Sequence, residues 1–277
     1  MSKIKSFAKI NFDLRVIKKL KNNFHNIRNI YSLINLADDI CIKKTKAKKD
    51  QLKFFGRFSK DIDNKNNSIK RILKFLREKK QINNFYEIKI YKKIPAFAGL
   101  GGGSSNAFFV SKFFLKRKKL ISYKKQISNI IGTDFTLFYN SSGYQENLTK
   151  IIALKKFNIF ILLVFPNIKC SSKNIYSKIR LKKYNKISKI KKFDERSLWK
   201  YLLKSKNDLQ NIVESKYPKI IDLINSISNQ KGCVFARMTG SGSACYGIFK
   251  SKNHSLKAFI KIKKKFPKYW CVNTKTI

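Results

Sequence analysis

The sequence predicts an α+β protein of one or two domains. Its 277 residues are enough to bury one large core or two moderate ones. Its composition, 43% hydrophobic and 13% aromatic, is that of a globular chain rather than a disordered one. Stretches with the two-residue alternation of strands recur between stretches whose apolar residues have helical spacing. This order favours sheets covered by helices, an α+β sandwich.

The first half is expected to contain three strands and three helices. The strands are residues 4–17, 30–44 and 85–93, the first two joined by a polar turn at 20–26. The helices are residues 66–80, 106–120 and 122–131. The first helix starts at an asparagine cap, and its apolar positions are Ile69, Ile72, Leu73 and Leu76. The second presents Phe109, Val110, Phe113 and Phe114 at helical spacing.

The second half repeats the alternation and is predicted to be a separate domain. Its expected strands are residues 157–166, 233–238, 245–250 and 269–274. Its expected helices lie in residues 197–204, 208–228 and 255–266. The very basic stretch 178–193 is expected to be a loop or an exposed helix. We place the domain boundary near residue 150, which gives domains of residues 1–150 and 151–277.

A glycine-rich loop, PAFAGLGGGSSNA, occupies residues 95–107 between a predicted strand and a predicted helix. Four of the eleven glycines of the chain lie here, and Ser104 and Ser105 occupy the place of a helix cap. Glycines let a backbone approach a ligand closely, and the N–H groups of a following helix attract anions. The loop lacks the lysine of a GxxxxGK[ST] motif and the last glycine of GxGxxG. We therefore expect a phosphate loop of another kind, the alternative being a simple glycine-rich turn.

The formal net charge of +48, from 63 basic and 15 acidic residues, raises the possibility of nucleic-acid binding. The lysines are spread along the whole chain among Asn and Ile rather than gathered in one segment. A bias towards AT-rich codons, which would enrich Lys, Asn, Ile and Phe together, accounts for this pattern at least as well as a dedicated nucleic-acid site does. We expect a diffuse field that attracts anionic substrates, and we consider nucleic acid an improbable partner.

Cellular context is suggested by the cysteines and by the lack of long apolar runs. The five cysteines form no CxxC pair, and with only two histidines a zinc site is not expected. The longest apolar run, residues 157–165, has the length of a strand rather than of a membrane span. We find no signal-peptide pattern at the start. A cytoplasmic protein with reduced thiols and no membrane partner is expected.

The loop, together with two further motifs, resembles the GHMP kinases, which include galactokinase, homoserine kinase and the mevalonate kinases. Its GLGGGSSNA is similar to the second motif of that family, and the triple glycine resembles the branch that acts on a diphosphocytidyl substrate in the non-mevalonate isoprenoid pathway. Ala8-Lys9-Ile10-Asn11 resembles the first motif, and Met238-Thr239-Gly240-Ser241-Gly242 the third. The resemblance implies an N-terminal domain of the ribosomal S5 type and a ferredoxin-like C-terminal domain.

The resemblance also assigns roles to residues. The ATP phosphates would be held by the loop residues Pro95, Ala96, Phe97, Ala98, Gly99, Leu100, Gly101, Gly102, Gly103, Ser104 and Ser105. Mg²⁺ would accompany ATP, with Ser104 or Ser105 able to approach it, and no fixed metal site is expected. Gly240, Ser241 and Gly242 would bring their backbone close to the loop and shape the active site, although a Gly-Ser-Gly turn can also be a plain hairpin.

Two residues inherit catalytic roles. Lys9 matches the active-site lysine of the first motif, and Asp134, in Gly132-Thr-Asp134-Phe135-Thr136, matches the catalytic aspartate of Gly-Ala-Asp-Val-Pro. Asp134 would take or orient the proton of the substrate hydroxyl. Lys9 would pair with Asp134 and hold it ionised, and would offset charge on the transferring group. From spacing alone, Lys9 could equally be a snorkelling lysine and Asp134 a helix cap.

Three residues are implied to hold the substrate base. Phe24 and His25 stand where the family has Tyr-His, and Tyr176 stands where it has a second aromatic residue. Phe24 keeps a stacking face but lacks the tyrosine hydroxyl. Without the motif, a histidine in a polar turn is more often a solvated surface residue and an aromatic residue after a strand is more often core.

The function implied is an ATP-dependent kinase that phosphorylates a hydroxyl of a diphosphocytidyl substrate. One alternative is another GHMP kinase, acting on homoserine or a mevalonate-pathway intermediate, although those usually carry GLGSSA at the loop. A basic nucleic-acid-binding protein with an S5-like fold is the alternative from another class, and it leaves the glycine loop unexplained.

Overall fold

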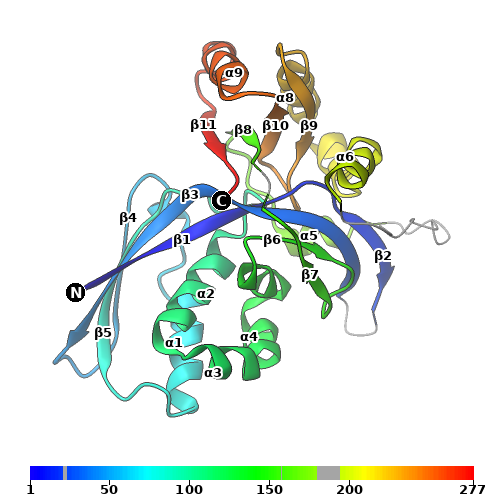
Figure 1. The fold of residues 1–277 in the computed structure, drawn as a ribbon. Helices are drawn as coiled ribbons and strands as arrows, with labels where there is room; N and C mark the ends of the chain where they lie inside the picture. Colours follow the sequence, from blue (N-terminus) through cyan, green and yellow to red (C-terminus); the bar gives the residue numbers. More distant parts are fainter. Residues whose placement is uncertain (21–23, 157, 180–193) are drawn as a thin grey trace. The chain divides into compact units, whose positions relative to one another are not determined.

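The computed structural model describes residues 1–20, 24–156, 158–179 and 194–277 (Figure 1). The chain forms two compact units, each assembled from separate segments of the sequence. The first unit comprises Met1–Ala8, Leu36–Ala96 and Gly101–Tyr139. The second comprises Lys9–Asn35, Phe97–Leu100 and Asn140–Ile277. Neither unit is a continuous stretch, and the boundary near residue 150 stays a prediction.

In the first unit, the sheet is built around β5 (Phe85–Tyr91), which confirms the strand expected there. β5 pairs antiparallel with the second half of β3 (His25–Thr45), from Asp39 opposite Tyr91 to Thr45 opposite Phe85. On its other side it pairs parallel with β4 (Gln51–Phe55), a strand that the sequence did not indicate.

The first unit contains all the helices expected in the first half, together with two 3-10 turns. They are α1 (Ser68–Glu78), α2 (Gly102–Phe114), α3 (Arg117–Ser122), α4 (Lys124–Ile131), η1 (Ser59–Asp61) and η2 (Thr133–Tyr139). Helix α1 begins as predicted, because the side chain of Asn67 accepts a hydrogen bond of 3.0 Å from the Lys70 N–H. The predicted apolar positions of α1 are all buried, and the helix packs against α2 and α4.

Helix α2 differs from its prediction at the start and on its buried face. It begins at Gly102, and its N-cap is Gly101, whose φ of +69° is accessible to glycine. Ser105 is therefore not a cap: its hydroxyl donates to the Phe7 carbonyl of β1 (Ser2–Asn11) at 2.6 Å. Phe113, expected on the apolar face, is 39% exposed.

In the second unit, the first half of β3 pairs antiparallel with β2 (Arg15–Lys19) and with β6 (Ser142–Gln145). β6 continues into an antiparallel hairpin with β7 (Ile151–Ala153). The single strand expected at residues 4–17 is thus two strands, β1 and β2. The chain breaks between them because Asp13 turns inward and accepts a hydrogen bond from the Ile30 N–H.

The four strands expected in the second half form one antiparallel sheet in the order β11-β8-β10-β9. They are β8 (Phe160–Phe165), β9 (Cys233–Met238), β10 (Cys245–Phe249) and β11 (Trp270–Lys275). Helices α8 (Lys219–Ser228) and α9 (Lys252–Lys265) pack on this sheet (Figure 1). Strand, helix, two strands, helix, strand in this order is the ferredoxin-like arrangement, which confirms the prediction.

Three further helices lie in the described part of the second unit: α5 (Ser172–Tyr176), α6 (Glu195–Lys204) and α7 (Gln210–Lys216). Helix α5 was not predicted, whereas α6 and α7 lie where helices were expected. The basic segment predicted at 178–193 falls, from residue 180 onwards, outside the described residues.

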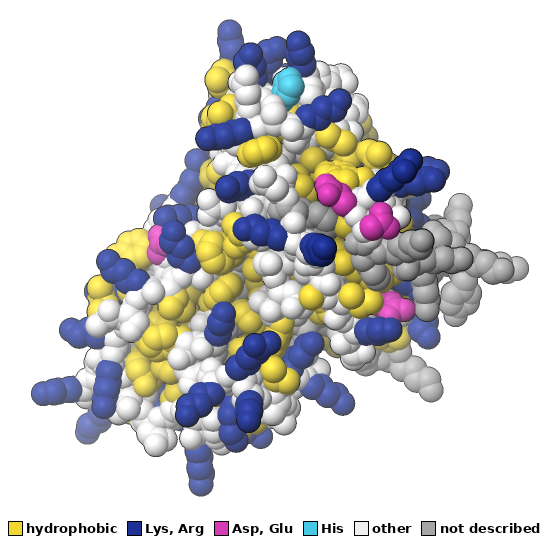
Figure 2. Space-filling model, in the orientation of Figure 1, with side chains coloured by type: hydrophobic (Ala, Val, Ile, Leu, Met, Phe, Trp, Pro, Cys, Tyr) yellow, Lys and Arg dark blue, Asp and Glu magenta, His cyan; other side chains and the backbone are white. Residues whose placement is uncertain are grey.

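The surface carries basic side chains over every part of the visible face rather than in one patch (Figure 2). Only a few acidic side chains are visible among them. All five cysteines are free thiols. Within the described part of the chain, no helix is both long and apolar enough to cross a membrane.

A buried carboxylate, Asp13, lies between β1 and β2 and links β3 to α6 in the second unit. Its Oδ1 accepts from the Ile30 N–H at 2.6 Å, and its Oδ2 accepts from the Tyr201 hydroxyl at 2.8 Å. Burial raises the pKa of Asp13 to about 6, although these two donors and the nearby Arg237 and Arg15 act in the opposite direction.

We expect Asp13→Asn to change how stability depends on pH. Because the pKa is raised in the folded state, Asp13 contributes a stability that is complete below about pH 4 and lost as the pH rises through about 6. Asparagine cannot titrate, so the variant should gain about 3 kcal/mol relative to the parent between pH 4 and pH 7. Urea unfolding of both proteins across this range measures the difference. Asp63→Asn, at an exposed position, is the control, and parallel curves for parent and Asp13→Asn would contradict the expectation.

Candidate active site

The middle of the glycine loop, Phe97–Leu100, is held through its carbonyl groups by other parts of the second unit. The carbonyls of Phe97, Ala98 and Leu100 accept from the backbone N–H groups of Cys170, Ala244 and Lys9, at 2.9, 3.2 and 3.1 Å. The Gly99 carbonyl accepts from the Lys9 Nζ at 3.1 Å. Carbonyl oxygens repel phosphate, so a segment whose carbonyls are all engaged in this way is suited to present N–H groups to an anion.

The turn of the third motif lies against this segment, as its predicted shaping role requires. A Cβ added at Gly99 would lie 2.2 Å from the Thr239 carbonyl oxygen and 3.0 Å from the Gly242 nitrogen. A Cβ at Gly240 would lie 2.7 Å from the Gly99 carbonyl oxygen and 3.2 Å from the Lys9 Nζ. Gly99 and Gly240 also have positive φ, of +77° and +56°. The two glycine segments therefore touch backbone to backbone next to Lys9.

The turn of the third motif is held in place by hydrogen bonds to Asn207 and Ser172. The Asn207 side chain donates to the carbonyls of Met238 and Gly240 at 2.9 and 2.8 Å. The hydroxyls of Ser172 and Ser241 are 2.7 Å apart. Nothing in the sequence marked Asn207, because an asparagine between two helices is an ordinary loop residue.

Lys9 is buried at the end of β1, with 3% of its surface exposed. Its Nζ donates to the Asn11 Oδ1 as well as to the Gly99 carbonyl. The Asn11 backbone N–H in turn donates to the Thr239 hydroxyl at 2.9 Å. The structure thus brings the first motif, the glycine loop and the third motif together around one ammonium group. Asn11 belongs to the first motif, but no feature of the sequence assigned it a role.

The remaining loop residues belong to the first unit. Pro95 and Ala96 precede the segment just described, and Gly101 to Ser105 carry the chain into the first turn of α2. The N–H groups of a first helical turn have no intrahelical acceptor, and the dipole favours an anion there. A Cβ at Gly102 would lie 3.1 Å from the Ile94 Cγ2, so this part of the loop is also closely packed.

A buried ion pair lies beside the start of α2. The Lys92 Nζ contacts the Asp38 Oδ2 and donates to the Asn106 Oδ1 at 3.1 Å. The Asp38 Oδ1 accepts from the N–H groups of Lys93 and Ile94 at 2.8 and 2.9 Å. This pair anchors α2, through Asn106, to the segment that enters the loop.

Asp134 is half-buried in the first turn of η2, in the first unit. Gly132, with φ of +125°, ends α4 just before it. Phe135 is fully buried and contacts Phe108 edge to face at 5.4 Å, and the Thr136 hydroxyl donates to the Thr133 carbonyl at 2.9 Å. Phe135 and Thr136, which stand where the family pattern has Val and Pro, are thus accommodated by the core and by the turn. Lys9 lies in the other unit, so its pairing with Asp134 stays a prediction.

His25 and Tyr176, two of the three residues expected to hold the base, lie together in the second unit. Their rings stack with centroids 5.3 Å apart and planes 28° from parallel. Partial burial, and secondly the positive charge of Lys19 on the paired strand, lower the pKa of His25, which favours a neutral ring. Phe24, which precedes His25, is 43% exposed.

A fixed metal site is not evident in the described residues, since no three His, Cys, Asp or Glu side chains are grouped to hold an ion. Of the two serines expected near Mg²⁺, Ser105 is buried, with its hydroxyl 2.7 Å from that of Ser6 and donating to Phe7. Ser104 is only half-buried. The Ser105 hydroxyl is therefore already engaged, and the role of Ser104 near Mg²⁺ stays a prediction.

Comparison with known proteins agrees with this geometry. A family model described as the GHMP kinases N terminal domain matches residues 67–131, and one described as GHMP kinases C terminal matches residues 187–268. A relative from Pelagibacter ubique, named 4-diphosphocytidyl-2-C-methyl-D-erythritol kinase, is 40% identical over 99% of both chains. A relative of the same name from Wolbachia pipientis is 31% identical, over 99% of this chain and 98% of its own.

A solved structure of a 4-(cytidine 5'-diphospho)-2C-methyl-D-erythritol kinase has the same fold. It is 18% identical and superimposes with a TM-score of 0.75 over 99% of both chains. Fold, domain matches and glycine motifs together define a GHMP kinase, an ATP-dependent kinase of small molecules. Within this class, the chain belongs to the family of 4-diphosphocytidyl-2-C-methyl-D-erythritol kinases.

Proposed function

We propose that this enzyme transfers the γ-phosphoryl group of ATP to the 2-hydroxyl of 4-diphosphocytidyl-2-C-methyl-D-erythritol, giving the 2-phosphate and ADP. This is a cytoplasmic step of the non-mevalonate route to isopentenyl diphosphate. The names of the full-length relatives support the proposal. The observation that carries it is the stacking of His25 on Tyr176, because two rings that are far apart in the sequence lie together, as their binding of one base would require.

To bind the base, His25 and Tyr176 would have to move apart so that it stacks between them, or the base would have to stack on the outer face of one ring. A ring placed between two others needs centroids about 7 Å apart, twice a contact distance of about 3.5 Å. The present separation is 5.3 Å, so His25 and Tyr176 fill each other's stacking positions here. A neutral His25 would add a ring N–H donor and a ring nitrogen acceptor for the edge of cytosine. Phe24, exposed beside it, would add a further apolar surface.

The phosphates of ATP would lie along the loop from Pro95 to Ser105. The backbone N–H groups of this loop and of the first turn of α2 would stabilise the negative charge. Lys9 would add a positive charge at the transferring group, and Asp134 would accept the proton of the substrate hydroxyl. Mg²⁺ would arrive with ATP, with Ser104 as a protein ligand, and would neutralise charge on the phosphate oxygens.

Release of ADP with different acceptors tests the proposal. The enzyme, ATP and Mg²⁺ are incubated with 4-diphosphocytidyl-2-C-methyl-D-erythritol, homoserine or mevalonate at equal concentration. We expect turnover with the diphosphocytidyl acceptor at least about 100-fold above the other two, since a site that stacks and hydrogen-bonds a base has nothing to bind in acceptors without one. Preferential turnover with homoserine or mevalonate would assign the chain to another GHMP activity. Tight, salt-sensitive RNA binding without turnover would refute the kinase proposal.

A further inference from the structure

Three buried amide side chains continue inward from Lys9 in the second unit. Asn11 lies on β1, Asn29 on β3 and Gln145 on β6, and β3 pairs with both of the other strands. The Asn11 Nδ2 donates to the Asn29 Oδ1 at 2.9 Å, and the Asn29 Nδ2 donates to the Gln145 Oε1. No more than 3% of any of the three is exposed. We call Asn11, Asn29 and Gln145 the amide row.

The direction of the amide row follows from the charge at its start. An ammonium group has only donors, so the atom of Asn11 that faces the Lys9 Nζ must be the carbonyl oxygen. The NH₂ group of Asn11 then points to Asn29, which must accept with its own oxygen. By the same reasoning Asn29 donates to Gln145, which must accept. Each amide has a single productive orientation, and the oxygen of Gln145 is the acceptor at the end of the described row.

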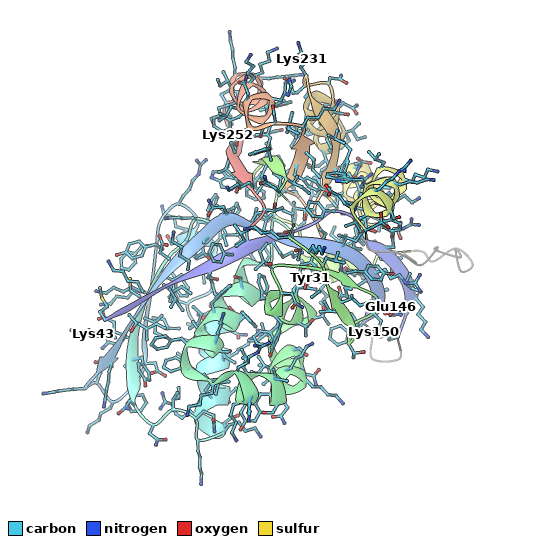
Figure 3. The ribbon with its side chains drawn as sticks, viewed as in Figure 1. Tyr31, Lys43, Glu146, Lys150, Lys231 and Lys252 are labelled. Carbon is cyan, nitrogen blue, oxygen red and sulfur yellow. The ribbon has the colours of Figure 1, made fainter. Side chains whose placement is uncertain are left out.

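The pairing of β3 with β6 places Gln145 at that position. Asn29 lies directly opposite Gln145, and Tyr31 directly opposite Gly143. A Cβ on Gly143 would lie 2.8 Å from the Tyr31 Oη, so Tyr31 packs closely on that glycine. Just after Gln145 the hairpin is closed by an ion pair of 2.8 Å between Glu146 and Lys150 (Figure 3). The register, and with it the contact between the two amides, is therefore well determined.

We propose that Gln145 and Asn29 are positioning residues for Lys9, acting through Asn11. If the row is intact, Asn11 presents oxygen to Lys9, and the ammonium group is held on the Gly99 carbonyl beside the glycine loop. If Gln145 cannot accept a hydrogen bond, the side-chain amide of Asn29 and then that of Asn11 can flip, which exchanges the positions of oxygen and NH₂. The NH₂ group of Asn11 instead of its oxygen then faces the ammonium group. The inference rests on the proposed function, because it assumes that Lys9 acts in phosphoryl transfer.

Gln145→Met tests the inference, because methionine has a similar length and cannot replace the carbonyl acceptor. We expect kcat to fall about tenfold, with the KM values for ATP and for the acceptor changed less than about twofold. Gln145→Glu keeps an acceptor at the same place and should retain most of the activity. Gln230→Met, the same substitution at a glutamine of the second unit outside the amide row, should leave kcat unchanged. Equal kcat for Gln145→Met and the parent would overturn the inference.

A double-mutant cycle separates positioning from a general loss of packing. In a Lys9→Met background, Gln145→Met should have no further effect on kcat, and an additive loss would overturn the inference. If Lys9→Met itself retains the parental kcat, the proposed role of Lys9 is refuted. If Gln145→Met does not fold, Asn29→Val and Asn29→Thr form a second pair of the same shape. Only threonine can accept from Asn11, so only Asn29→Thr should keep activity.

Discussion

Asp134→Asn is expected to lower kcat by about 10²- to 10⁴-fold while leaving the fold intact. Asparagine has nearly the same shape as aspartate but cannot accept the proton of the substrate hydroxyl at neutral pH. Asp134 is half-buried in the first turn of η2, between the buried Phe135 and the end of α4, so the carboxylate occupies a defined place. If the interaction is made only during proton transfer, kcat and kcat/KM should fall together. Steady-state release of ADP measures both.

A control for Asp134→Asn must lose the same charge at a comparable place on a helix. Asp222 lies in the first turn of α8, and Asp222→Asn also removes a carboxylate that interacts with a helix dipole. We expect this variant to keep the parental kcat, and both variants to unfold within a few degrees of the parent. If Asp134→Asn turns over at the parental rate with its melting temperature unchanged, Asp134 is only a helix-terminal residue and the mechanism is wrong.

The sequence predicted well the elements with a strong periodic signal. Helix α1 has an asparagine cap and four apolar residues at helical spacing, and both features are found where they were expected. The four strands of the ferredoxin-like sheet are apolar runs bounded by turns, and their order followed from the family resemblance. Short elements were missed, since β4, β6, β7 and α5 contain three to five residues and carry too little pattern.

Only those residues of the candidate site that lie in the sequence motifs could be predicted. Gly240 to Gly242 were expected to approach the glycine loop, and Gly99 lies against Gly240 and accepts a hydrogen bond from Lys9. The roles of these residues in binding and catalysis stay predictions. The role of Asn29 could not be expected, because its partners are set by the register of three strands that lie far apart in the sequence. The cap of α2 was misplaced because a glycine in the left-handed region replaced a serine cap, a choice decided by the competing use of the Ser105 hydroxyl.

Gly99→Ala is expected to destabilise the enzyme by at least about 3 kcal/mol. The new methyl group would lie 2.2 Å from the Thr239 carbonyl oxygen, a distance that no relaxation of a side chain can relieve, since the neighbour is backbone. The φ of +77° adds strain for any residue with a Cβ. The turn of the third motif would have to move, which would disturb the Gly99 carbonyl that holds Lys9. Both the midpoint of urea unfolding and kcat should therefore fall.

Gly103→Ala distinguishes this close approach from a general need for flexible glycines. A Cβ at Gly103 would meet no atom closer than the Ser68 Oγ at 3.7 Å, and Gly103 lies inside α2 without a positive φ. Alanine there should be neutral or stabilising by up to about 1 kcal/mol, because it favours the helix. If both substitutions destabilise the protein equally, the glycines serve chain flexibility. If only Gly99→Ala does, Gly99 is required because the third motif packs directly on its α-carbon.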